Sequence, residues 1–333
     1  MLLEVLSIIF LLLLGLVLII KFGDYFVDGA TWVAEVSGIP KFIVGATIVS
    51  VATTLPEIMV SLISARSAPD MAIGNAVGSV VFNTGVIMAI ALIAQPFYIK
   101  RKDYAFKGLL LFITMLLISL FSFKGVDILN INKNTLGMFG YISSVIVFSL
   151  FVVYILENVY SAKKNAGENV KEKPKATKRS LLINLSKLIA GAAGIAIGSI
   201  LLKNNAAKLA EIAGIPQAVI GVTILAIGTS LPELVTMIIA VKKGESSLSV
   251  GNIIGANTID LAFILPMSAF ITMGNGLPVA NIHLLITMPI TLLIIAIAII
   301  PTLISKKFSR WQGGLMISIY GMYFIYNVVY AIV

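Results

Sequence analysis

The sequence contains no cysteine and a single histidine, His283, among its 333 residues. Disulfide bonds and thiolate chemistry are therefore excluded, as is any metal site that needs two imidazole ligands. Charged residues are also scarce. They make up 12% of the chain, whereas soluble domains carry about 25%. Because 59% of the residues are hydrophobic, the composition predicts a polytopic membrane protein.

Ten stretches are apolar enough to cross a bilayer, which takes roughly 20 helical residues. They run over 5–27, 42–64, 73–94, 104–123, 136–156, 181–202, 219–241, 248–273, 284–305 and 314–333. The first is expected to be a retained helix and not a signal peptide, because Glu4 stands where a basic cluster would be and no small-x-small cleavage site follows. We therefore expect an all-α membrane protein of ten transmembrane helices.

The basic residues are distributed unevenly between the loops that connect these stretches. When the loops are assigned to alternate sides, 18 Lys and Arg residues fall on one side and five on the other, with Lys187 inside a helix. Cytoplasmic loops carry the excess of Lys and Arg, so we expect a multi-pass protein of the cell membrane with both termini outside. The net charge of +9 is then a topology signal, and no nucleic-acid partner is expected.

The chain repeats itself once, with its motifs in the same order and at nearly the same spacing in each half. The sequence LPE at 55–57 recurs at 231–233, and GNAVG at 74–78 recurs as GNIIG at 251–255. The polar, basic stretch between the halves has the composition of a solvated linker. The predicted units are a first transmembrane repeat (helices 1–5, residues 1–160), a cytoplasmic linker (161–180) and a second repeat (helices 6–10, residues 181–333). An odd number of helices per repeat inverts the second repeat relative to the first.

Each LPE motif places a carboxylate beside a proline, deep in a predicted helix. Proline has no N–H, so the carbonyls near Ala52 and Gly228 lose their usual hydrogen bond. An unpaired carbonyl in hydrocarbon needs a protein group, a water or an ion. Ionisable residues at this depth are functional-site candidates, and we assign that role to Glu57 and Glu233. Carboxylates, hydroxyls and carbonyls are the ligands of hard cations, so the motifs predict one shared cation site at the membrane midplane.

The alternative is that the prolines only kink the helices and that nearby hydroxyls bond back to the backbone. That alternative leaves both glutamates unexplained.

Asn83 and Asp260 occupy equivalent positions in the two halves, about one turn beyond the paired glycines. The glycines are expected to allow close helix packing. Asp260 is predicted to be a third buried carboxylate, and Asn83 to be a ligand or an interhelical hydrogen bond. Three ionised carboxylates would carry −3 against the +2 of a calcium ion, so at least one is expected to be protonated in the empty site. Asp260 is the candidate, because its mate Asn83 works uncharged.

These motifs resemble the two α-repeats of the calcium/cation antiporter superfamily, and within it most closely the prokaryotic sodium/calcium exchangers. The resemblance covers the core helices 2, 3, 7 and 8 closely. It implies a metal site in which Glu57 and Glu233 serve calcium and sodium alike, and a mechanism in which helices 1 and 6 slide across a rigid core. The implied ligands are Ser50, Thr53, Thr54, Glu57, Ser79, Asn83, Ala226 (through its carbonyl), Thr229, Ser230, Glu233 and Asp260.

Two departures from the family pattern bear on the coupling ion. Ala256 stands where the second repeat usually has the serine that matches Ser79, and the first repeat reads Ala52-Thr53-Thr54 where Gly-Thr-Ser is commoner. Both keep open a proton-coupled calcium antiporter as the alternative. Against protons, the GNAVGS stretch lacks the glutamate that proton/calcium members carry there.

The sequence therefore predicts a secondary active antiporter that exchanges calcium for sodium, acts as a monomeric transport unit, and needs no cofactor beyond the transported ions. A cation channel with the same oxygen cluster is a second hypothesis, which would show uptake without a counter-ion. An intramembrane hydrolase is a third, but the chain has no nucleophile–base motif such as GxSxG or HExxH. We therefore expect a protein that is not an enzyme.

Overall fold

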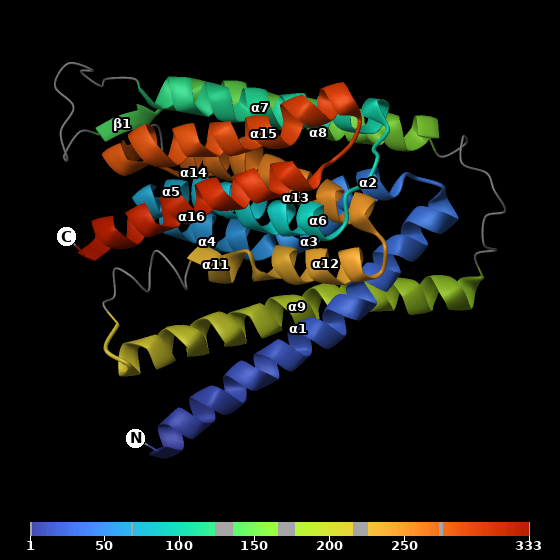
Figure 1. Ribbon diagram of the computed structural model, residues 1–333, viewed down its shortest axis with the longest axis horizontal. Helices are drawn as coiled ribbons and strands as arrows, with labels where there is room; N and C mark the ends of the chain where they lie inside the picture. The colour runs from blue at the N-terminus through green and yellow to red at the C-terminus, as the bar shows by residue number, and fades with distance from the viewer. Residues whose placement is uncertain are drawn as a thin grey trace.

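The computed structural model describes residues 2–67, 69–123, 136–165, 177–215, 226–272 and 276–332. Over these ranges the elements are almost all helices, so the class is all-α, as predicted (Figure 1). The elements of the first half are α1 (Leu2–Ser37), α2 (Lys41–Val44), η1 (Gly45–Val49), α3 (Ser50–Thr53), α4 (Leu55–Ser67), α5 (Pro69–Phe82), η2 (Asn83–Met88), α6 (Ala89–Ala94), α7 (Arg101–Ser122), β1 (Leu136–Phe139) and α8 (Tyr141–Asn165). Those of the second half are α9 (Lys178–Ile212), α11 (Ala226–Thr229), α12 (Leu231–Lys242), α13 (Ser246–Ile259), η5 (Asp260–Ile264), α14 (Leu265–Ile271), β2 (Leu277–Ala280), η6 (His283–Thr287), α15 (Met288–Ser305) and α16 (Arg310–Ile332). The η elements are π-helical turns.

Seven helices among the described residues are long and apolar enough to cross a membrane, and an eighth span is a pair bent by 47° between Thr53 and Leu55. Of the other two predicted spans, 314–333 lies almost wholly within α16. The start of 219–241 lies outside the described residues, and its remainder forms α11 and α12. The count of ten therefore remains a prediction.

The predicted span 136–156 is wrong at its beginning. Residues Leu136–Phe139 form β1, which pairs antiparallel with β2, and the helix begins only at Tyr141. Short apolar runs fit strand and helix alike. Here pairing with β2 selects the strand, and glycine at 137 allows the strand to lie against the end of α7, because a Cβ at this position would lie 2.0 Å from the Ser122 carbonyl oxygen. The predicted linker 161–180 is helical at both of its ends, and 166–176 lies outside the described residues.

Helices α1 and α9 are much longer than hydropathy predicts. Hydropathy finds only their apolar parts, while the helices continue through polar residues until a glycine stops them. Gly38 (φ +72°) follows α1 and Gly214 (φ +77°) follows α9, the left-handed conformation that commonly ends helices. The two glycines are separated by the same offset as the two LPE motifs, so the halves end these helices in the same way.

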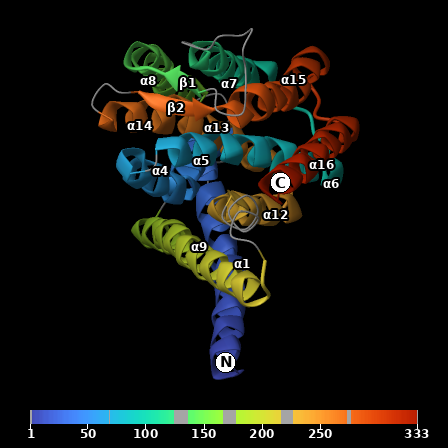
Figure 2. The same cartoon turned by 90° about the vertical axis from the view of Figure 1, so that its left-hand side faces the viewer.

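The pair α1 and α9 cross each other on one side of the molecule. Most of their length lies below the bundle in both views, while the C-terminal end of α1 rises toward α2 (Figures 1 and 2). Glycines allow the crossing, because a Cβ at Gly15 would lie 2.8 Å from the Gly198 carbonyl oxygen. Close backbone approach through small residues is typical of membrane helices. The layer farthest from this pair contains α7, α8 and α15.

The centre of the bundle is α13, in which thirteen of fourteen residues are buried. Its glycines face the first half. A Cβ at Gly251 would lie 2.2 Å from the Phe42 carbonyl oxygen, and one at Gly255 would lie 2.5 Å from the Ser50 hydroxyl. These glycines therefore bring α13 against α2 and α3, which is the packing role predicted for them.

Candidate cation-binding site

Two matched helix breaks lie at the centre of the molecule. Thr54 separates α3 from α4, and Ser230 separates α11 from α12. Each break is two residues before a proline, Pro56 or Pro232, that cannot donate a hydrogen bond to the carbonyl four residues earlier. The breaks occupy equivalent positions in the two halves, so the repeat seen in sequence is also a repeat of backbone conformation.

The two glutamates lie in the first turns of the helices that follow these breaks. Glu57 is 1% exposed and Glu233 is fully buried. Helix N-termini stabilise negative charge, because their backbone N–H groups are unpaired and their dipoles point favourably. The breaks thus place two carboxylates in the interior with a local source of stabilisation.

Asn83 and Asp260 begin the π-helical turns η2 and η5, respectively. Both side chains are buried. π-Helical turns inside α-helices frequently occur at functional sites. The two residues are as far apart in the chain as the two GN motifs, so the backbone again reproduces the sequence repeat.

Hydrogen bonds cross between the halves in a reciprocal way. The Thr53 hydroxyl donates to Asn252 Oδ1 at 3.1 Å, and the Thr229 hydroxyl donates to Asn75 Oδ1 at 3.4 Å. Thr53 and Thr229 are equivalent in the two repeats, as are Asn75 and Asn252. Equivalent residues exchange equivalent bonds across an isologous twofold interface. Each asparagine therefore positions a threonine of the other half by accepting a hydrogen bond from its hydroxyl.

A further bond joins the first break to the second glutamate, since the Thr54 hydroxyl donates to Glu233 Oε1 at 3.3 Å. The three carboxyl groups are also close enough to interact electrostatically, Glu57 with both Glu233 and Asp260, and Asp260 with Glu233. The two repeats therefore bring their acidic side chains to one region.

The structure places the predicted site residues as follows. The described side chains are all at most 5% exposed. Ser50 and Thr53 lie on α3, Thr54 at its end, Glu57 on α4, Ser79 on α5, Asn83 on η2, Thr229 on α11, Ser230 at its end, Glu233 on α12 and Asp260 on η5. Ala226 begins α11, and its side chain lies outside the described residues.

Many of these buried polar atoms have no hydrogen-bond partner in another described residue. They are both carboxylate oxygens of Glu57 and Asp260, Oε2 of Glu233, the Ser79 and Ser230 hydroxyls, and both amide atoms of Asn83. Such atoms cost free energy unless they are satisfied, and their clustering is what a site for a hard cation requires. Ser50 differs, because its hydroxyl donates to the Thr47 carbonyl at 3.1 Å.

No three acidic or histidine side chains among the described residues form a group compact enough to hold a metal by themselves. A cation at this position would therefore need the hydroxyl, amide and carbonyl oxygens in addition to the carboxylates. This mixed donor set is the one that Ca²⁺ takes in proteins.

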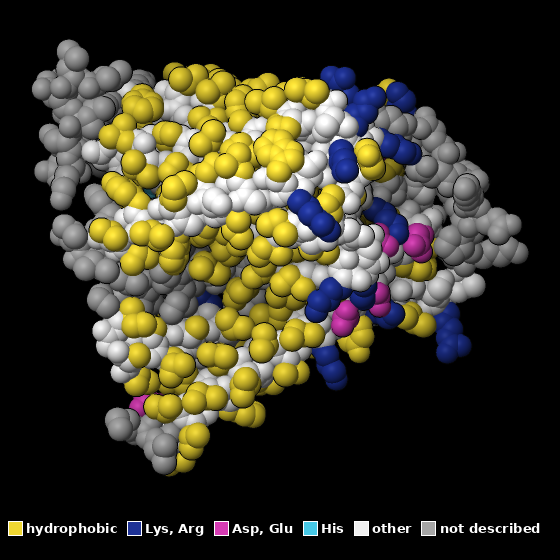
Figure 3. All heavy atoms as spheres, in the orientation of Figure 1, with side chains coloured by type: hydrophobic (Ala, Val, Ile, Leu, Met, Phe, Trp, Pro, Cys, Tyr) yellow, Lys and Arg dark blue, Asp and Glu magenta, His cyan; other side chains and the backbone are white. Residues whose placement is uncertain are grey.

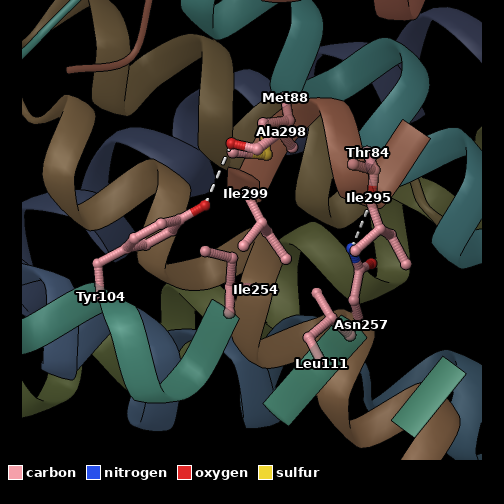
Figure 4. Close-up of a pocket in the computed structure, with 9 residues that line it drawn as sticks. All are labelled: Thr84, Met88, Tyr104, Leu111, Ile254, Asn257, Ile295, Ala298 and Ile299. Atoms are coloured by element: carbon pink, nitrogen blue, oxygen red, sulfur yellow. Dashed lines mark hydrogen bonds between the residues drawn. The ribbon is translucent and has the colours of Figure 1, made fainter. Parts of the chain in front are cut away.

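Behind the site lies a small cavity of about 10 Å³ between η2, α7, α13 and α15 (Figure 4). Asn257 donates from Nδ2 to the Thr84 hydroxyl at 2.7 Å across it, and the Tyr104 hydroxyl donates to the Ala298 carbonyl at 3.2 Å. The remaining lining side chains are apolar, so the cavity has room for about one water at most. The Asn257–Thr84 bond joins α13 to η2 one residue beyond Asn83, and the Tyr104–Ala298 bond joins α7 to α15.

The family model described as "Sodium/calcium exchanger protein" matches residues 7–159 and 184–329. This chain belongs to the sodium/calcium exchanger family. Its relatives include an uncharacterized membrane protein of Methanocaldococcus jannaschii, 30% identical with 92% of this chain and 94% of the relative covered. Another is the sodium/calcium exchanger MaX1 of Methanosarcina acetivorans, 28% identical with 93% and 95% covered.

The fold is similar to solved structures of the sodium-calcium exchanger NCX_Mj. The one soaked with 2.5 mM Na⁺ and 10 mM Sr²⁺ has a TM-score of 0.78 and 27% identity, and the match covers 96% of this chain and 98% of that one. The exchanger family to which the chain belongs consists of transporters, and its members are polytopic membrane proteins. The family resemblance drawn from the two motifs is therefore confirmed over nearly the whole chain.

Sequence reasoning missed one residue at this site. Helix 6 was predicted to end at residue 202, which put Lys203 in a loop. It lies instead inside α9, and its side chain packs on Gly228 at the second break. The only sequence signal was a lysine directly after an apolar run, and hydropathy discards that signal because it takes such a lysine as the end of the helix.

Proposed function

We propose that this protein is a secondary active antiporter that moves calcium outward across the cell membrane in exchange for sodium moving inward, by alternating access to one midplane site. The observation that carries the proposal is the bond from Thr54, on the first break, to Glu233, on the second. It joins the two halves at a group of buried oxygens that lack other partners. Membership of the sodium/calcium exchanger family indicates which ions are transported, and the oxygen ligands at the site are of the kind that these ions bind.

The site is proposed to use the ligands that the sequence indicated. Glu57 and Glu233 would contribute to the binding of either ion, with oxygens from the two breaks, from Ser79, Asn83 and Asp260, and from the Ala226 carbonyl. Because calcium and sodium would occupy overlapping oxygens, each excludes the other. Mutual exclusion couples the two fluxes through reciprocal linkage, and no separate coupling device is needed.

The proposed architecture is ten transmembrane helices in two inverted repeats, residues 1–160 and 181–333, with a cytoplasmic linker between them. The reciprocal Thr–Asn bonds, the matched breaks and the matched π-turns support an inverted twofold relation. The two stretches matched by the family model also coincide with the two repeats.

The proposed orientation puts both termini outside the cell. On the face shown in Figure 3, most Lys and Arg side chains gather at one end of the molecule, while both chain ends lie toward the other end in Figure 1. Basic residues are enriched on the cytoplasmic side, which supports the assignment of that end to the cytoplasm.

The test is counterflow of radiolabelled calcium in sealed proteoliposomes loaded with sodium. Glu57→Gln and Glu233→Gln each remove a charge and keep the shape of the side chain, so both are expected to abolish sodium-driven calcium flux. Glu4→Gln, at an exposed position near the start of α1, is the control and should transport normally. Size-exclusion elution of each variant reports its folding.

Undiminished exchange by either glutamine variant would reject the site. Calcium flux that is driven by a proton gradient and does not depend on sodium would show that sodium is not the coupling ion. Flux down a calcium gradient without any counter-ion would mean that the protein is a channel.

A further inference from the structure

Lys203 lies beside the candidate site, on α9, the helix that crosses α1 on one side of the bundle. With Ser199, Pro56 and Thr229 it lines a cavity of about 440 Å³ between α9, α4 and α11. Its stem rests on the backbone of the second break, because a Cβ at Gly228 would lie only 2.4 Å from Lys203 Cγ. Glycine at 228 therefore provides the space that this lysine occupies.

Lys203 bears on the site through its charge and through its stem. Its charge is close enough to favour the ionised form of Glu57, as the weakest of the electrostatic influences on that carboxyl group, while neither Glu57 oxygen accepts a hydrogen bond from it. Its stem also covers Gly228, whose carbonyl Pro232 leaves without a backbone donor. A lysine ammonium is a compact charge with three donors on a flexible stem, so it resembles a monovalent cation that is attached to the protein.

The charge balance of the site changes when Lys203 is included. Glu57, Glu233 and Asp260 carry −3 when ionised, whereas one calcium ion supplies +2. The missing positive charge was assigned from the sequence to a proton on Asp260. The lysine supplies the same charge without protonation, because −3 is balanced by calcium plus one ammonium, and equally by two sodium ions plus one ammonium.

The two repeats are asymmetric at the corresponding positions. When the two LPE motifs are aligned, Val27 is the residue that matches Lys203, so the first half has no equivalent charge. The second half also lacks a hydroxyl, since Ala256 stands where the first has Ser79. A ligand for a small cation is thus missing from the same half that gains a tethered cation.

We propose that the Lys203 ammonium, placed beside the site, supplies the positive charge of one sodium ion, so that the protein exchanges two sodium ions for one calcium ion without net charge movement. The inference rests on the proposed sodium/calcium exchange and specifies its stoichiometry. Net charge over a complete cycle depends only on the ions carried, because the lysine returns with the protein.

The first test measures whether exchange moves charge. Proteoliposomes with the wild-type protein are clamped at different potentials with valinomycin and potassium gradients. The sodium gradient at which net calcium flux vanishes is then determined. For the wild type this null point is expected to be independent of potential. In the double variant Lys203→Gln/Ala256→Ser, which loses the charge and regains the hydroxyl, it should correspond to three sodium ions and shift with potential. Lys203→Arg should behave as the wild type.

The second test measures binding in detergent and does not require transport. Removing a nearby positive charge should raise calcium affinity in Lys203→Gln on the order of tenfold. Sodium affinity, measured by competition, should rise only by about the square root of that factor, because a monovalent ion experiences half the repulsion. Lys208→Gln, at an exposed position on the same helix, is the matched control and should change neither affinity.

Both results are required. A potential-dependent null point in the wild type, an unchanged null point in the double variant, or unchanged calcium affinity in Lys203→Gln would each overturn the inference. Wild-type protein that shows no sodium-driven flux would refute the proposed function, and the binding measurement would still decide whether Lys203 acts on the site.

Discussion

At the scale of single residues, the site depends on hydroxyls as much as on carboxylates. Thr53, Thr54 and Thr229 each donate a hydrogen bond to a side chain of the other half. Thr47 does not, because its hydroxyl bonds back to the Ile43 carbonyl at 2.7 Å in its own helix. Similar threonines on neighbouring turns therefore have different roles, which makes a direct comparison possible.

Thr54→Val is expected to weaken calcium binding about tenfold to a hundredfold. A hydrogen bond to a charged group contributes about 1.5–3 kcal/mol, and valine keeps the shape while leaving Glu233 Oε1 without its donor. Calcium affinity in detergent measures the effect. Thr47→Val is the control, and equal effects of the two variants would show that the Thr54 bond is not specific to the site.

Residues also explain how much of the site could be predicted from sequence. The glutamates were found because a carboxylate beside a proline in an apolar helix has no structural explanation. Lys203 was not found, because its role depends on a crossing of two helices that are distant in sequence. Asn75 and Asn252 were recognised as a repeated pair, but only the fold could give each its threonine partner.

At the scale of elements, Pro56 and Pro232 are expected to matter for ion binding and not for the stability of the fold. Proline inside a helix costs about 3 kcal/mol because it removes one hydrogen bond and crowds the preceding turn. Pro56 and Pro232 avoid this cost, because each lies in the first turn of the helix that follows a break, α4 or α12, where proline is tolerated. Each still leaves the carbonyl four residues earlier without a backbone donor.

Pro232→Ala is therefore expected to keep or raise the melting temperature in detergent while calcium exchange falls at least tenfold. Alanine has the backbone N–H that proline lacks, so it can donate a hydrogen bond to the Gly228 carbonyl. The carbonyl is then no longer free to bind an ion, and the helix becomes straighter. Pro301, inside α15, provides the matched control, since Pro301→Ala should keep or raise the melting temperature and leave exchange unchanged. Normal exchange by Pro232→Ala would mean that the break is only a kink.

Elements were predicted unevenly for physical reasons. Apolar length located the helical stretches from α5 to α6, α7, from α13 to α14 and from η6 to α15 well, because these stretches end close to where their apolar runs end. It failed at Leu136–Phe139, where pairing with a distant strand determines the structure, and at α1 and α9, which continue through polar residues beyond their apolar runs. In α1, the region beyond Lys21 forms ion pairs with the rest of the molecule.

At the scale of the whole molecule, ion pairs connect the crossing pair to the core at one end. Lys243, at the end of α12, lies 2.6 Å from Asp28 and 3.2 Å from Asp24 on α1, and Lys187 of α9 lies 3.9 Å from Asp28. Partial burial lowers the pKa of Lys243, but hydrogen bonds to Asp28 and Asp24 outweigh it and raise the pKa above its ordinary value. Lys243 therefore stays charged at neutral pH.

Asp28→Asn is expected to speed calcium exchange a few-fold at low ionic strength, because the sliding of α1 that the family resemblance implies would require α1 to separate from α12. Exposed ion pairs contribute at most about 1 kcal/mol each, and at about 1 M salt the Debye length of ~3 Å screens them. The increase should therefore vanish at high salt and be independent of pH between 6 and 8. Lys21→Gln, at an exposed position on the same helix, serves as the control. An acceleration that persists in high salt would exclude the ion pairs as its cause.

The reciprocal threonine–asparagine bonds have a consequence for how such a protein can arise. Each half supplies one donor and one acceptor, and neither half can satisfy its own pair. For the inverted five-helix repeats proposed above, a five-helix precursor would complete the pattern only with a second copy inserted in the opposite direction, so it would need to enter the membrane in both orientations. Joining two copies into one chain would let each half change alone, and Ala256 and Lys203 are differences that a symmetric dimer would have to make twice.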